Sequence, residues 1–107
     1  MADSVKVILT RCLRGPGTIP ELRQFHRIVE IPHAPFPGLA LDWWIGDEDG
    51  GATITSVLYD LDLGMYVADC RGSDVLCPAD LKEEAQAMRR TGWAKGEPNW
   101  EALEHGG

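Results

Sequence analysis

The stretch Leu39-Ala40-Leu41-Asp42-Trp43-Trp44-Ile45 decides the fold of this chain. Large apolar residues fill every odd position, and Asp42 stands between two of them. A period of two is the pattern of a β-strand that has one face on a core. The alternation therefore predicts that Trp43 faces the core, while Asp42 and Trp44 face outward.

Other segments on both sides of this stretch are rich in β-branched residues and are separated by residues that favour turns. We expect strands over 5–10, 25–31, 52–59 and 65–70, with the first able to continue to residue 13. Residues 21–24 are compatible with one helical turn. We expect a loop at 15–20, a stiff proline-rich connection at 32–38, a hairpin turn at 46–51, a tight turn at 60–64 and a strand break at 71–74.

One helix is expected near the C-terminal end. Pro78 suits the first helical position, because its missing N–H would be unpaired there in any case. Gly92 suits a left-handed cap at the other end, with Trp93 as the apolar residue that folds back onto it. Between them, one helix face carries the apolar residues Leu81, Ala85 and Met88.

These elements define an α+β fold. Sequential strands joined by short turns pair antiparallel, so we expect an antiparallel sheet or small, partly open barrel of about five strands. The strands would follow one another as a meander, with one main C-terminal helix across a face or end. A chain of 107 residues has the length of one domain. We expect residues 1–107 to form a single domain, with 96–107 as a loosely ordered tail.

Charge and composition restrict the partners. Asp and Glu number 17 against 10 Lys and Arg, which gives a formal net charge of -7. This balance, without a basic cluster, argues against a nucleic-acid partner. No apolar run approaches the roughly 20 residues that cross a bilayer, so we expect no membrane partner. The N-terminus lacks a secretory pattern, and the cysteine count is odd, so we expect a cytoplasmic protein with thiols packed as small hydrophobes.

Side chains that could carry chemistry are present, but their spacing is unfavourable. Six residues separate Cys70 from Cys77, and six separate His26 from His33, whereas structural zinc sites use tight pairs two to four residues apart. We therefore predict no metal and no cofactor, and no catalytic residues can be assigned. The alternative is a small enzyme or metal-binding domain that uses these four residues with Asp60, Asp62 or Asp69.

The tryptophans point to a binding function. The chain has four of them, and an outward Trp44 needs cover from the helix, another strand or a partner. We interpret the chain as a small, non-enzymatic binding protein that self-associates, or binds another protein, through the face bearing Asp42 and Trp44. Tyr66 and Arg71, near the ends of the fifth strand, are weaker candidates for this surface. A second alternative is an acidic inhibitor or immunity-type protein that neutralises a basic partner.

Overall fold

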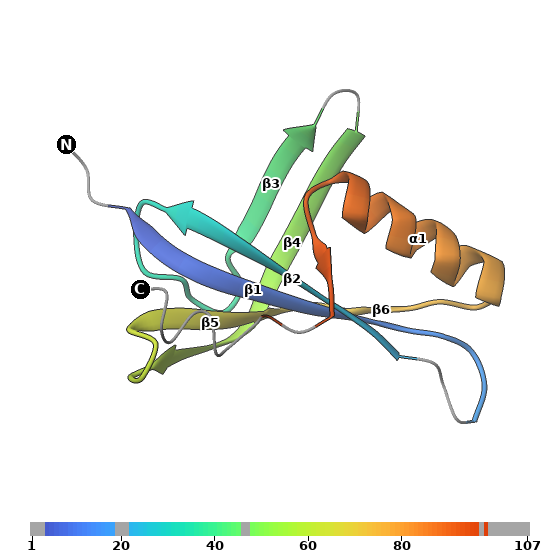
Figure 1. The fold of residues 1–107 in the computed structure, drawn as a ribbon, viewed down its shortest axis with the longest axis horizontal. Coiled ribbons are helices and arrows are strands. Elements are labelled where there is room, and N and C mark those ends of the chain that lie inside the picture. The colour runs from blue at the N-terminus through green and yellow to red at the C-terminus, as the bar shows by residue number, and fades with distance from the viewer. Residues whose placement is uncertain (1–3, 19–21, 46–47, 97, 99–107) are drawn as a thin grey trace.

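The computed structural model describes residues 4–18, 22–45, 48–96 and 98 (Figure 1). The side chains of 43–45, 48–50 and 73 lie outside that description. Its elements are β1 (Val5–Arg14), β2 (Leu22–Ile31), β3 (Ala40–Ile45), β4 (Glu48–Asp60), β5 (Met65–Cys70), β6 (Ser73–Asp74), α1 (Pro78–Arg90) and β7 (Ala94–Lys95). Strands therefore occur at the five predicted places and the helix at its predicted place, but the short strands β6 and β7 add to the predicted number of about five.

Three local predictions are wrong. Residues 22–24 belong to β2 and not to a helical turn, because they pair with residues 12–14 of β1 and extend that hairpin. Residues 71–74 do not simply end the sheet, because Ser73 and Asp74 form β6 parallel to β1. Most of the acidic turn expected at 46–51 is also strand, since β4 begins at Glu48.

Gly51 allows close packing inside the β3–β4 hairpin. Gly51 lies opposite Asp42, and a Cβ placed on it would stand 3.0 Å from the Asp42 Oδ1 atom. The missing side chain leaves room for the Asp42 carboxylate beside the ladder. The glycine pattern that favours a turn therefore also serves close packing within a strand. The turn itself falls at 46–47, outside the described residues.

The sheet is curled, and its strand order differs from a flat meander. The order is β3-β4-β5-β1-β2-β7, with β6 on β1. β1 and β5 pair in parallel, and β2 does not pair with β3. The curling of the sheet brings β1 and β5 together. Strand direction alternates along the chain from β1 to β5, so the first and the fifth of these strands run in the same direction. The prediction of a partly open barrel is thus confirmed in outline, but the expectation of purely antiparallel pairing is wrong.

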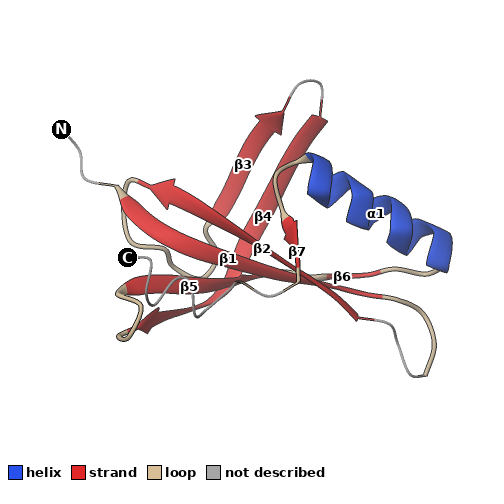
Figure 2. Ribbon diagram, viewed as in Figure 1, coloured by secondary structure: helices blue, strands red, loops and turns tan. Residues whose placement is uncertain are grey.

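The hydrophobic core lies on the concave side of the sheet. The β3–β4 hairpin and α1 both rise from one side of the crossing strands β1, β2 and β5 (Figure 2). Phe25, Leu9 and Leu13 are almost completely buried there and are joined by the predicted helix face of Leu81, Ala85 and Met88. Burial of these side chains away from water is the main force that holds the helix on the sheet.

The end of α1 has the predicted cap. Gly92 has a φ of 104°, and its N–H donates to the Arg89 carbonyl at 3.3 Å. The Trp93 N–H donates to the Met88 carbonyl at 3.0 Å, and the indole is buried. This pair of bonds is the Schellman arrangement, which satisfies carbonyls that a helix end leaves unpaired. Trp93 therefore belongs to the core, as the residue that folds back onto the cap.

The expected tail at 96–107 falls outside the described residues except for Gly96 and Pro98. Gly96 donates its N–H to the Gln24 carbonyl at 2.6 Å, and Pro98 is buried. No helix in the described part of the chain has the length and apolarity that a membrane crossing requires.

Candidate functional site

The curled sheet is open between β2 and β3. Within the described residues, β3 pairs only with β4, and β2 pairs with β1 and, at Phe25 and His26, with β7. Following the pairing round the sheet shows that β3 runs opposite to β2. Two antiparallel strand edges therefore border the opening.

The alternation of hydrogen-bonding direction along a strand shows which backbone groups of β3 face the opening. The Ile54 N–H donates to the Leu39 carbonyl at 2.9 Å, so Leu39 faces β4. Backbone groups alternate in direction along an antiparallel strand. Odd-numbered residues of β3 therefore bond to β4, and the N–H and C=O groups of Ala40 and Asp42 point away from it, into the opening.

The pairing of β2 with the β7 segment shows which backbone groups of β2 face the opening. The Gly96 N–H bonds to the Gln24 carbonyl on the β7 side, so even-numbered residues of β2 direct their backbone groups to that side. β7 ends the pairing at His26. Beyond it, the backbone groups of Ile28 and Glu30 face the opening that β3 borders from the other side.

A depression of about 330 Å³ lies between the two edges. It is lined by residues 27–31 of β2 and by Leu41 and Asp42 of β3. The guanidinium of Arg27 is directed to the end of α1, where its Nη1 donates to the Thr91 carbonyl at 2.6 Å. Ile28 is 44% exposed, so an apolar side chain as well as backbone groups is accessible here.

Two of the four predicted contact residues lie together. Asp42 and Arg71 line a second depression of about 240 Å³ beside Arg11. The Arg11 Nε donates to the Arg71 carbonyl at 3.0 Å, which links β1 to the end of β5. Asp42 and Arg71 are both exposed, and Leu41 packs against the core, as the alternation along residues 39–45 predicts.

The other two predicted residues are not brought to that place. Tyr66 is half-buried on the core side, near the opposite end of β5, with its ring edge-on to Tyr59 at 4.9 Å between centroids. Trp44 belongs to β3, but its side chain lies outside the described residues. The outward direction of Trp44 therefore stays a prediction.

A polar row that the sequence did not reveal crosses the outer face of the sheet. The strand registers place His26, Thr10, Asp69 and Ser56 side by side on β2, β1, β5 and β4. The Thr10 hydroxyl donates to Asp69 Oδ1, and the Ser56 hydroxyl donates to Asp69 Oδ2 at 3.0 Å. The His26 ring bonds through Nδ1 to the Gly96 carbonyl at 2.8 Å, so that nitrogen carries the proton. These residues are distant in sequence, and only the register assembles them.

The candidates for metal chemistry do not converge. His26 bonds to Gly96, whereas His33 bonds through Nδ1 to the neighbouring Ala34 carbonyl and stacks on Phe36. Asp60 accepts hydrogen bonds from the backbone N–H groups of residues 62 and 63, as a turn-forming aspartate does. Among the described residues, no group of three His, Cys, Asp or Glu side chains could hold a metal ion.

Cys70 is a packing residue. Burial raises the pKa of its thiol from 9.0 to about 11, with the Arg11 charge opposing and the Asp69 charge reinforcing this rise. A thiol reacts as its thiolate, so Cys70 is poorly suited to nucleophilic chemistry at neutral pH.

The raised pKa predicts a fall in stability at alkaline pH. Below about pH 9 the thiol is protonated in both states. Between about pH 9 and 11 the unfolded chain releases this proton and the folded chain keeps it, so the free energy of unfolding falls by on the order of 2 kcal/mol. Urea titrations at several pH values should show that the free energy of unfolding falls less steeply with pH in Cys70→Ala than in the wild type. An identical slope in both proteins would contradict the assignment.

Comparisons with protein-family models, curated proteins and solved structures find no match to this chain.

Proposed function

We propose that this chain is a non-enzymatic binding protein that pairs an extended segment of another polypeptide with the open edge of β3. One observation carries the proposal: the backbone groups of Ala40 and Asp42 face an opening that is also bordered by the edge of β2. Unpaired strand edges recruit extended peptides through main-chain hydrogen bonds. The six residues of β3 offer an edge of about 20 Å.

Charge supports a basic partner segment. Between residues 28 and 70 the chain has no lysine or arginine, whereas it has eight acids: Glu30, Asp42, Asp47, Glu48, Asp49, Asp60, Asp62 and Asp69. β3, β4 and the turn between them belong to this segment. Lysine or arginine in an added strand would meet opposite charge, which favours both encounter and register.

A second copy of the chain is the competing occupant, and self-association was the interpretation from sequence. Antiparallel pairing of β3 with β3 would set acidic hairpins against each other. Like charges across a strand pair are destabilising. The charge distribution therefore favours a basic segment of a different protein, and a dimer joined at β3 is the outcome that would replace it.

The edge can be tested with two variants at one position. Asp42→Pro removes the outward N–H, whereas Asp42→Ala removes the same charge and keeps that N–H. The probes are short blocked peptides that alternate Lys with Val, Thr with Val, or Glu with Val. We expect the Lys–Val peptide to slow hydrogen exchange at the Ala40 amide in the wild type and in Asp42→Ala. Asp42→Pro should bind about tenfold or more weakly.

The outcomes separate the alternatives. Absence of peptide-induced protection at residues 40 and 42 would reject strand addition. Protection of these amides without peptide, together with a dimer in sedimentation, would make a second copy the occupant. If Asp42→Pro does not fold, Ala40→Pro removes the neighbouring outward N–H with Ala40→Ser as its control. The wild-type exchange measurement decides the main question without any variant.

A further inference from the structure

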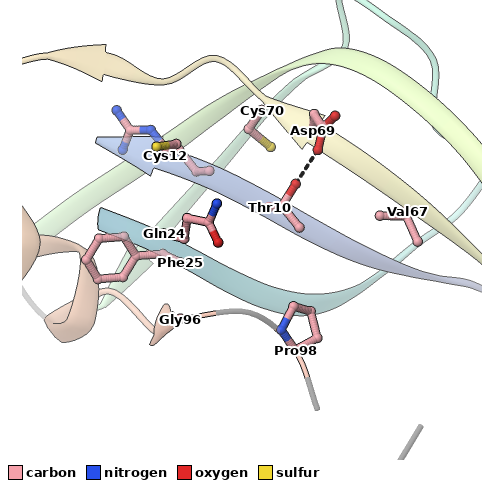
Figure 3. Close-up of a pocket in the computed structure, with 10 residues that line it drawn as sticks. Thr10, Cys12, Gln24, Phe25, Val67, Asp69, Cys70, Gly96 and Pro98 are labelled. Carbon is pink, nitrogen blue, oxygen red and sulfur yellow. Dashed lines mark hydrogen bonds between the residues drawn. The ribbon is translucent and has the colours of Figure 1, made fainter. Parts of the chain in front are cut away.

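A cavity of about 320 Å³ lies against strands β1, β2 and β5 (Figure 3). Strand alternation assigns its inner wall to the outward side chains of three strands: Thr10 and Cys12 of β1, Gln24 of β2, and Val67 and Asp69 of β5. Gly96 and Pro98 border it from the segment after α1. Phe25 and Cys70 also line the cavity, although both belong to the core cluster.

Asp69 supplies the charge of this cavity and is held in position. Each of its carboxylate oxygens accepts one hydroxyl hydrogen, from Thr10 and from Ser56. The Thr55 hydroxyl also donates to the Asp69 carbonyl at 3.1 Å. A carboxylate fixed at both oxygens is preorganised and still has lone pairs available for a further donor.

The groups around Asp69 offer acceptors to a hydrogen-bond donor, and the Gln24 amide adds both an acceptor oxygen and a donor NH2. The Thr10 hydroxyl has given its hydrogen to Asp69, so its oxygen offers lone pairs. The Cys12 thiol is directed to the Leu13 carbonyl at 3.7 Å. Arg11 also borders the cavity, but its Nε donates to the Arg71 carbonyl, and strand alternation puts its side chain on the core side.

A bare metal ion does not suit this arrangement. Ca²⁺ takes six to eight oxygen ligands and Mg²⁺ takes six, whereas the cavity offers one carboxylate and no group of three candidate ligands among the described residues. An ammonium group needs only a few acceptors around one negative charge. Val67 and Pro98 provide apolar walls on which a short alkyl chain can pack.

We propose that this cavity binds a small organic cation, a primary ammonium with a short alkyl chain. Its N–H groups bond to the Asp69 carboxylate and the Thr10 oxygen, and its chain lies along Val67 and Pro98. Asp69 is exposed, so water screens the ion pair and the dissociation constant falls in the millimolar range. The site is independent of strand addition at β3.

Three probes of similar size and different charge test the proposal on the full chain: n-butylammonium, n-butanol and n-butyrate. Titration is followed by the amide resonances of residues 10, 12, 67 and 69. We expect saturable shifts with n-butylammonium that weaken as salt is added. Asp69→Asn should weaken binding at least about tenfold. Asp62→Asn, at an exposed turn, removes the same charge elsewhere and should leave binding unchanged.

Each other outcome rejects the proposal. Equal binding of n-butanol would define a merely apolar cavity, and preference for n-butyrate would define an anion site. Shifts that spread over the surface without saturation would show unspecific attraction to an acidic protein. The comparison of the three probes needs no variant, so the proposal stays testable if Asp69→Asn does not fold.

Discussion

Phe25→Ala is expected to lower the free energy of unfolding by about 3–5 kcal/mol. Phe25 is the largest of the fully buried side chains, with 1% of its surface exposed. Its removal loses the transfer free energy of the ring and leaves a cavity between β2 and the helix side of the core. At Phe25, β2 pairs with β1 on one side and with β7 on the other. These backbone pairings hold the strands in place, so they can move only partly into the space.

Urea unfolding followed by tryptophan fluorescence measures this loss. Leu22→Ala is the matched control, because Leu22 begins the same strand with 58% of its surface exposed. The control should change the free energy of unfolding by less than about 1 kcal/mol. Equal losses for the two variants would mean that the β2 end of the core is not packed as described.

Local sequence patterns predicted the elements well. The alternation in residues 39–45 predicted β3, and its inward Leu41 and exposed Asp42 are confirmed. Pro78 and Gly92 marked the two ends of α1. These successes share one physical basis, since strand alternation, proline at a helix start and glycine at a helix end act within a few residues.

Pairing between distant strands was not predictable in this way. Nothing within 65–70 indicates that β5 pairs with β1, because that register is set by how the sheet curls round its core. The parallel pair is what brings Thr10 to Asp69 and so creates the polar row. For the same reason the sequence predicted a partly open barrel but not that its opening lies beside β3, although the prolines at 32–38 marked a connection with few ladder bonds.

Asp42 illustrates how far the site prediction reached. The sequence correctly predicted that it faces solvent, from the period of two. The role that we propose for it at the edge of β3 depends on its backbone groups, whose direction follows from the pairing of Leu39 with Ile54. The alternation in the sequence specifies the face on which a side chain lies. The direction of the backbone N–H and C=O groups can be assigned only when the register with the partner strand is also known.

Gly72→Ala is expected to destabilise the fold by roughly 3 kcal/mol through overpacking. A Cβ placed on Gly72 would stand 2.3 Å from the Cys12 carbonyl oxygen, far inside van der Waals contact. The obstacle is backbone and not a flexible side chain. Relief therefore requires β1 to move away from the segment that joins β5 to β6, which is where the parallel pairing closes the curled sheet.

The expected loss is measured by urea unfolding against Arg71→Ala, which alters the preceding exposed residue without adding a Cβ. That control should lie within about 0.5 kcal/mol of the wild type. Gly72 also lines the depression that contains Asp42 and Arg11, so movement of this segment should shift their amide resonances even where Gly72→Ala remains folded. Wild-type stability together with unchanged resonances would show that β1 and the β5–β6 connection are not in close contact, and the closure of the half-barrel would have to be revised.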